Sequence, residues 1–414
     1  MQRGAFSTSR ATSDDFLDSR AGWTVAGAAF LSMFAVFSVH YSFGSFFTSM
    51  ADEFETGRGT TALFFAITNF LYFGLGVLTG RVADRIGPRP VMLCGAASLF
   101  IGLLLTATVQ SIWVGYLTYG LGVGLAVACG YVPIVAAVST WFDKRRTTAL
   151  GVAVAGIGAG TLAGAPLAEF LIDHYGWRQT YQIFAIGAGA LLVVASFGAD
   201  AAPKAPDAAP PIPVWTTIRA HRGFWVLWLA SFIMVLPLFV PFVYLDDYMV
   251  DKMIDGSSGW LIGLIGVSSV VGRLALGALG ARLSVTGLFK LSFLVLACSF
   301  LIWIVAGTSY GMLMAFTIVL GVSYGGFIAL SPAVAAEIFG VIGLGGILGA
   351  IYTAAGVGGL IGPPLMGAII DGFGYTTALM TSFVLGAIST AILFVALPKS
   401  PMPVAVAPTP AVAG

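Results

Sequence analysis

Charged residues are scarce in this chain of 414 residues, because Asp, Glu, Lys and Arg make up only 9% of it while apolar types make up 58%. A soluble globular protein carries about 25% charged residues. So few charges cannot cover a surface that faces water, and the mean hydropathy of +0.97 agrees with this. The composition therefore excludes a soluble protein and predicts one that crosses a bilayer many times.

Cysteine and histidine are equally rare, with three of each. Cys94, Cys129 and Cys298 lie in apolar runs without metal-ligand spacing, so they indicate neither a zinc site nor a disulfide framework. The net charge of +1 comes with no long basic cluster, which gives no sign of nucleic acid binding. We find no Ser/His/Asp set and no nucleotide motif. The sequence thus predicts no enzyme activity, cofactor, metal or nucleic acid partner.

Long apolar runs dominate what is present. A spanning helix needs about 20 predominantly apolar residues. Breaks at charged or Pro/Gly-rich turns divide the chain into twelve such runs, and the first is too long for a cleaved signal peptide. We therefore predict an all-α membrane protein with twelve transmembrane helices. The expected spans are 22–48, 60–81, 89–108, 111–140, 147–172, 178–198, 223–245, 258–280, 287–306, 310–336, 341–370 and 375–397.

The basic residues predict the orientation of these spans. Of the nineteen Lys and Arg residues, all but four fall in the tails and in the loops on the same side as the tails. Arg58, Arg178 and Lys252 fall on the opposite side, and Arg273 falls within a span. Because Lys and Arg accumulate in cytoplasmic loops, we predict cytoplasmic termini and location in a cell inner (plasma) membrane.

An internal repeat divides the chain into two halves. When the chain is shifted by 198 residues, 150–176 aligns with 348–374 without gaps, and Asp173 coincides with Asp371. Two parallel six-helix halves are typical of secondary transporters, which bind substrate between their halves. The glycines of this repeat form small-xxx-small faces that predict close helix packing. The predicted organisation is a tail 1–21, a half 22–198, a linker 199–222, a half 223–397 and a tail 398–414.

The loop between the second and third spans carries a motif. "GRVADRIGPRP" (80–90) matches the G-x-x-x-D-R-x-G-x-[RK] signature of the major facilitator superfamily. An acid beside several arginines can form an ion pair whose rupture lets the two halves part, so Asp84, Arg85 and Arg89 are candidates for conformational gating. The alternative is a solvated loop that only sets orientation. The corresponding place in the second half has Ala281 instead of the acid.

A closer resemblance covers nearly the whole chain. The first span and above all "WFDKRRTTALGVAVAGIGAGTLAGAPLAEFLIDHYGWRQ" (141–179) resemble the monocarboxylate transporter family, near the oxalate/formate antiporter group. The resemblance implies the major facilitator fold and a substrate carboxylate bound by an arginine of span eight, which is Arg273 here. Animal members have a lysine and an aspartate that the resemblance ties to proton coupling. Tyr41 and Ser269 stand at these positions, so coupling stays open.

Arg273 is the principal candidate for substrate binding. An arginine at the centre of a spanning helix costs about 2.5–3.5 kcal/mol on insertion scales, which a wet cavity and an anion would offset. A fixed ion pair with a buried acid is the alternative. The other substrate-binding candidates, each with packing as its alternative, are Tyr131, Tyr324, Tyr352, Asn69 and Tyr41. Phe43, Phe327 and Ile328 are expected to select a short apolar tail.

His40 and Glu169 are candidates for proton coupling. An imidazole titrates near pH 6.5, and the alternatives are a neutral packed histidine and a solvated helix end. The sequence predicts a monomeric, alternating-access transporter of small monocarboxylates such as lactate or pyruvate, with proton symport favoured. Carboxylate exchange, bulkier aromatic acids as substrates and, more remotely, an anion channel remain alternatives.

Overall fold

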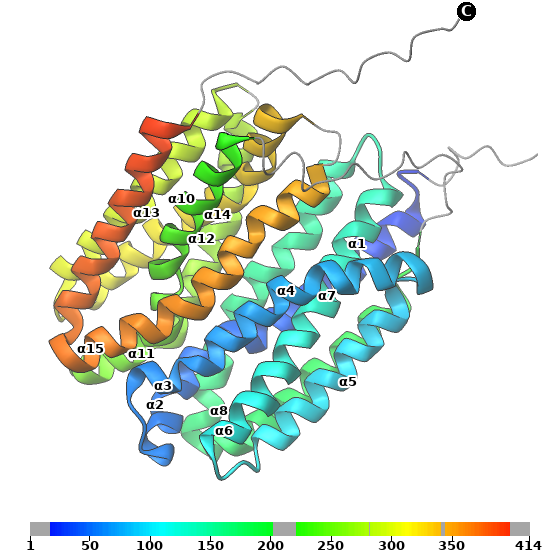
Figure 1. The fold of residues 1–414 in the computed structure, drawn as a ribbon. Coiled ribbons are helices and arrows are strands. Elements are labelled where there is room, and N and C mark those ends of the chain that lie inside the picture. The colour runs from blue at the N-terminus through cyan, green and yellow to red at the C-terminus, as the bar shows by residue number, and fades with distance from the viewer. Residues whose placement is uncertain (1–16, 202–220, 281, 341–343, 398–414) are drawn as a thin grey trace, which may run out of the picture.

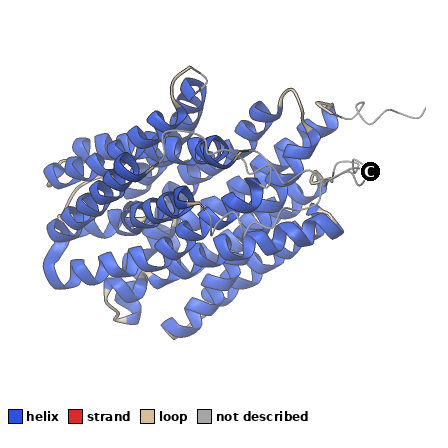
Figure 2. Cartoon of the chain, turned by 45° about the horizontal axis from the view of Figure 1, so that its top comes forward, coloured by secondary structure: helices blue, strands red, loops and turns tan. Residues whose placement is uncertain are grey.

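The structure, a computed structural model, describes residues 17–201, 221–280, 282–340 and 344–397. The C-terminal tail, most of the N-terminal tail and most of the linker 199–222 lie outside the described residues. Within the described residues every regular element is a helix (Figure 2). Ten helical stretches there are long and apolar enough to cross a membrane. The prediction of an all-α, multi-pass membrane protein is confirmed.

The helices follow one another with short connections. Their bounds are α1 (Arg20–Tyr41), α2 (Phe43–Phe54), α3 (Arg58–Thr61), α4 (Leu63–Ile86), α5 (Pro88–Thr106), α6 (Ile112–Gly115), the π-helix η1 (Tyr116–Leu121), α7 (Gly122–Trp141), α8 (Arg146–Phe197), α10 (Arg222–Leu238), α11 (Val240–Asp251), α12 (Ser258–Gly280), α13 (Val285–Ala306), α14 (Tyr310–Phe339) and α15 (Leu344–Ala396).

Helices α8 and α15 are more than twice as long as one crossing needs, with 52 and 53 residues. Each is interrupted once, at Gly176 (φ 76°, ψ 162°) and at Gly374 (φ 80°, ψ 170°), conformations that essentially only glycine adopts. Figure 1 shows the sharp bend of α15. The two interruptions lie 198 residues apart, so the sequence repeat is also a structural repeat. If α8 and α15 each cross the membrane twice, the ten helical stretches make the predicted twelve crossings.

Helix packing is repeated as well, because α8 packs against α1 in the same way as α15 packs against α10. A Cβ atom at Gly160 of α8 would lie 2.5 Å from the carbonyl oxygen of Phe34 on α1. At Gly358, the repeat mate in α15, it would lie 3.0 Å from the carbonyl oxygen of Phe232 on α10. These glycines let backbones approach closely, which confirms their predicted role in helix packing.

The bundle has two chemically distinct ends. At the first, which we call the Asp18 end, the backbone N–H of Lys144 donates to the Asp18 carboxylate at 3.1 Å. At the other, the Arg58 end, Arg178 donates to the Ala107 carbonyl at 2.9 Å. Figure 1 shows α3, which begins at Arg58, and α6 at the end of the bundle opposite the start of α1, so Arg58 and Arg178 lie opposite Lys144, as the division of basic residues predicts.

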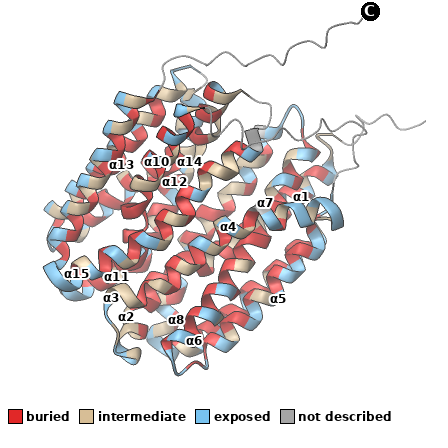
Figure 3. Cartoon of the chain, in the orientation of Figure 1, coloured by how far each residue is buried: buried red, intermediate tan, exposed pale blue. Residues whose placement is uncertain are grey.

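The outward faces of the bundle are apolar. Large side chains such as Trp113, Val305 and Phe373 are 69%, 73% and 75% exposed, whereas the residues between the helices are buried (Figure 3). Such an apolar exterior suits hydrocarbon and not water. The polar residues inside the bundle therefore stand out as candidates for function.

Candidate functional site

Arg273 lies where helices of both halves meet. Its Nη1 donates to the carbonyl oxygen of Val154 on α8 at 3.3 Å. Its Nε and Nη2 atoms are buried and have no hydrogen-bond partner among the described residues. Described ion pairs do not include it either, so the fixed-pair alternative finds no support there. An unpaired buried donor is costly, and Nε and Nη2 together carry three N–H groups to which no described residue offers an acceptor.

Tyrosines from both halves surround this guanidinium. The Tyr41 hydroxyl of α1 lies 3.0 Å from the Tyr324 hydroxyl of α14, in a hydrogen bond between the halves. Tyr41, Tyr131 of α7 and Tyr324 all lie close enough to interact electrostatically with Arg273. Tyr352 of α15 interacts in the same way with Tyr131. The structure therefore brings three predicted tyrosines to the predicted arginine and places a fourth, Tyr352, next to one of them.

Tyr72 of α4 is a further member of this group that sequence reasoning missed. It is buried and interacts electrostatically with both Tyr324 and Tyr131. The signal for it is its spacing from Asn69. Residues three apart share a helix face, so a polar residue at 69 predicts that position 72 faces the same way.

His40 and Asn69 lie directly behind this tyrosine cluster. The His40 ring stacks on Phe65 with centroids 4.5 Å apart and lies 5.7 Å from the Tyr72 ring. Asn69 donates to the Phe65 carbonyl at 3.1 Å and lies beside His40. Both His40 nitrogens and the Asn69 Oδ1 nevertheless lack a partner with hydrogen-bond geometry among the described residues. Two predicted residues thus hold unsatisfied polar groups next to the tyrosines.

The rings that contact the tyrosine cluster differ from those expected. Phe37 lies 5.8 Å from Tyr131 between ring centroids, and Phe242 lies 4.5 Å from Tyr41. Phe43 instead stacks on Phe64 within the first half. Phe327 packs at 5.2 Å on Phe293 within the second half, and Ile328 is half-buried.

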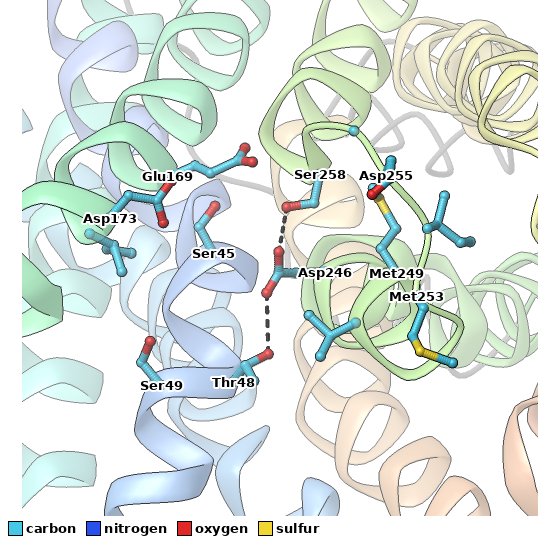
Figure 4. Close-up of a pocket in the computed structure, with 14 residues that line it drawn as sticks. Ser45, Thr48, Ser49, Glu169, Asp173, Asp246, Met249, Met253, Asp255 and Ser258 are labelled. Atoms are coloured by element: carbon cyan, nitrogen blue, oxygen red, sulfur yellow. Dashed lines mark hydrogen bonds between the residues drawn. The ribbon is translucent and has the colours of Figure 1, made fainter.

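Glu169 lies away from this cluster, at the Arg58 end. Its Oε2 accepts hydrogen bonds from the Ser257 hydroxyl at 2.5 Å and from the backbone N–H of Gly259 at 2.8 Å, at the start of α12. It lines a cavity of about 400 Å³ between the halves. Figure 4 shows Asp246 across the cavity, with hydrogen bonds from Ser258 (2.5 Å) and Thr48 (3.2 Å). Glu169 therefore joins the two halves and is not a freely solvated helix end.

The predicted gating residues lie at the end of α4 and the start of α5. Asp84 and Arg85 are exposed, and no described ion pair includes them. The Arg89 guanidinium lies 4.7 Å from the Phe197 ring centroid, within its own half. Their gating role stays a prediction.

This arrangement, a repeated helical bundle with a buried cation and hydroxyl groups between its halves, is that of a membrane transporter. The family model "Major Facilitator Superfamily" matches residues 26–310 and 256–412. A solved bacterial homologue of the human lysosomal transporter Spinster, in its inward-facing and unoccupied conformation, has the same fold. The TM-score is 0.73 at 14% identity, over 91% of this chain and 97% of that one.

Curated relatives narrow this class. Monocarboxylate transporter 3 of Rattus norvegicus is 32% identical over 371 residues, which cover 86% of this chain and 75% of that protein. Monocarboxylate transporter 4 of Mus musculus is 29% identical over 373 residues, 86% and 78% of the two chains. The chain belongs to the monocarboxylate transporter family of the Major Facilitator Superfamily. The predicted resemblance is confirmed, and the protein is a transporter and not an enzyme.

Proposed function

We propose that the protein is a secondary transporter of small monocarboxylate anions of the lactate and pyruvate class. The observation that carries this proposal is the Arg273 guanidinium, buried between the halves with its Nε and Nη2 atoms unpaired among the described residues. A carboxylate pairs with a guanidinium through two parallel hydrogen bonds. The names of the relatives give independent support for a monocarboxylate.

In this proposal the remaining cluster recognises the rest of the substrate. The hydroxyls of Tyr41, Tyr72, Tyr131, Tyr324 and Tyr352 surround the polar end. Phe37 and Phe242, which touch these tyrosines, face the apolar tail. Asn69 and His40 offer unsatisfied polar atoms for a hydroxyl or keto group, or for water.

The test is Arg273→Ala in purified protein and in proteoliposomes. We expect loss of saturable lactate uptake and loss of thermal stabilisation by lactate, because the carboxylate loses its partner. Arg273→Lys keeps the charge but not the two-pronged geometry, and should restore only part of the affinity. Arg282→Ala removes an exposed arginine just beyond α12 and serves as the control. Unchanged lactate uptake by correctly inserted Arg273→Ala protein would overturn the proposal.

We propose further that transport proceeds by alternating access and is coupled to proton symport. His40 is the first candidate for the proton site because both its nitrogens are buried, unpaired and next to the tyrosine cluster. Glu169 is the second, since it joins the halves. An imposed inward proton gradient should accelerate lactate uptake, and His40→Gln should flatten the pH profile of that uptake.

Indifference to the proton gradient together with intact counterflow would favour carboxylate exchange. A channel would show flux without saturation or counterflow. We propose that the protein acts as a monomer in a cell inner membrane, with both termini in the cytoplasm. We assign gating at the cytoplasmic face to Asp84, Arg85 and Arg89.

A second candidate function is transport of bulkier aromatic acids. It is favoured by the rings of Phe37 and Phe242 against the cluster and of Tyr72 within it, because such rings pack well against an aromatic tail. Thermal-shift measurements across a series of monocarboxylates from lactate to phenylacetate would decide between the two. Stronger stabilisation by the aromatic acids would favour the second.

A further inference from the structure

The Arg58 side chain is less exposed than expected for a residue in the connection between α2 and α4. It is the first residue of the short helix α3 in the first half. Its side chain is only 29% exposed, although an arginine in a connecting loop normally extends into water. Figure 1 shows α3 and α11 beside the bend of α15, so this loop reaches the second half.

The guanidinium and backbone of Arg58 bind two carboxylates of the second half. Nε donates to Asp247 Oδ2 at 2.5 Å and Nη2 to Asp247 Oδ1 at 3.3 Å, a two-pronged contact with α11. The backbone N–H donates to Asp371 Oδ2 at 2.9 Å and Nη1 to Asp371 Oδ1 at 3.3 Å, on α15. One residue thus joins the first half to two separate helices of the second.

The surroundings hold this arrangement in place. The Tyr375 hydroxyl donates to the same Asp247 carboxylate, whose side chain is 11% exposed. The Tyr244 hydroxyl lies 2.6 Å from the Pro363 carbonyl and 3.3 Å from the Arg58 carbonyl. A Cβ atom at Gly59 would lie 2.8 Å from the Pro364 carbonyl oxygen. Oriented side chains and a close backbone approach distinguish this contact from a surface ion pair between flexible side chains.

Arg178 provides an internal comparison at the same end. It forms an equally short ion pair, with Glu53 at 2.5 Å, and donates to the Ala107 and Val109 carbonyls. All these partners belong to the first half. The Arg178 contacts therefore brace one half, whereas the Arg58 contacts cross between the halves.

We propose that Arg58, Asp247 and Asp371 form an inter-half lock that holds the Arg58 end closed, and that this lock must break before the substrate site opens toward that end. The inference rests on the proposed alternating access, but it concerns the conformational equilibrium and not the substrate. Replacing the guanidinium removes the contacts to both carboxylates. The population open at the Arg58 end should then rise at the expense of the closed one.

The test measures the separation of the halves directly. Cys94, Cys129 and Cys298 are replaced by serine, and spin labels are attached through Ser111→Cys and Thr308→Cys. Both positions are exposed at the Arg58 end, one in each half. Electron–electron double resonance on protein in lipid nanodiscs then reports the distance distribution without any substrate. Arg58→Gln should increase the longer-distance population about fivefold, the effect of losing a partly exposed ion pair at the upper end of its measured range.

Arg178→Gln is the matched control and should leave the distribution unchanged. Arg58→Lys retains the charge and should partly restore the closed population. If Arg58→Gln does not fold, Asp371→Asn tests the same lock from the other half. A distribution in Arg58→Gln or Asp371→Asn protein equal to that of Arg178→Gln would overturn the lock. The proposed function fails on a different result, namely lactate binding that survives Arg273→Ala.

Discussion

The two repeats of this transporter connect to the opposite half in different ways. In the second repeat, Asp371 of α15 accepts the backbone N–H at the start of α3 and also binds the Arg58 guanidinium. In the first repeat, Glu169 of α8 accepts the backbone N–H of Gly259 near the start of α12 and a hydroxyl from Ser257. Each repeat places a carboxylate against the beginning of a helix in the other half.

The difference lies in the charge that accompanies the carboxylate. The α15 contact includes a cation, while the α8 contact includes hydroxyls and lines a cavity with two further acids, Asp173 on the same helix and Asp246 on the opposite side. The acids also come from different positions, because Glu169 corresponds to Gly367 and Asp371 corresponds to Asp173 under the shift of 198 residues. The two repeats therefore share a backbone arrangement, but their side chains differ. The Asp371 contact is an ion pair, whereas Glu169 is bound by a hydroxyl and a backbone N–H.

The largest losses of thermal stability are expected from substitutions at the two bends, where the two repeats are alike. Gly176→Ala and Gly374→Ala each place a side chain in a conformation that disfavours it, at a cost of about 1–3 kcal/mol. Both variants should lower the melting temperature of the purified protein by similar amounts. Gly187→Ala, in a helical position with open space around it, is the control and should be nearly neutral. A large shift in only one variant would contradict the structural equivalence of the bends.

Smaller and unequal losses of stability are expected at Asp371 and Asp173, because only Asp371 pairs with an arginine. Asp371→Asn weakens the pairing with Arg58 and should lower stability by about 1 kcal/mol, since the side chain is partly exposed. Asp173→Asn, at the equivalent exposed position, has no described hydrogen bond to lose and should be neutral. The measurement is the melting temperature of each purified variant, compared with that of the unmodified protein. Equal shifts would show that the ionic contact does not distinguish the repeats.

The smallest effect is expected for Glu169→Gln. The amide keeps an oxygen to accept from Gly259 and Ser257, so the change removes mainly the favourable charge at the start of α12. Such an interaction contributes about 0.3–1 kcal/mol and is screened by salt. The shift in melting temperature should therefore shrink between 50 mM and 500 mM NaCl. A larger, salt-independent loss would instead indicate that the carboxylate is essential to the packing of the halves.

Much of the scaffold could be predicted from the sequence because membrane helices leave strong local signals. The apolar runs, the aligned Asp173 and Asp371, and the isolated charge of Arg273 are all visible in the chain. Tyr41, Tyr131, Tyr324 and Tyr352 were named one by one as substrate-binding candidates, but that they meet in one cluster depends on how the two halves pack. Tyr72 was missed because one tyrosine in an apolar run is normally a packing residue.

The Arg58 lock could not be predicted, because its partners lie 189 and 313 residues away along the chain. In the sequence, Arg58 counts only as a charge that helps to orient the spans. Its contact with Asp247 and Asp371 depends on the tilt of α11 and on the bend of α15, which periodicity does not specify. Residues that meet only in one arrangement of the two halves leave no local pattern.

The interruption of α15 at Gly374 lies close to the proposed lock. Asp371 lies three residues before this glycine, and no loop separates the two long stretches that meet there. The earlier stretch carries Tyr352 of the tyrosine cluster. Asp371 and Tyr352 therefore belong to one continuous helical stretch, which links the proposed lock at the Arg58 end to the tyrosine cluster inside the bundle.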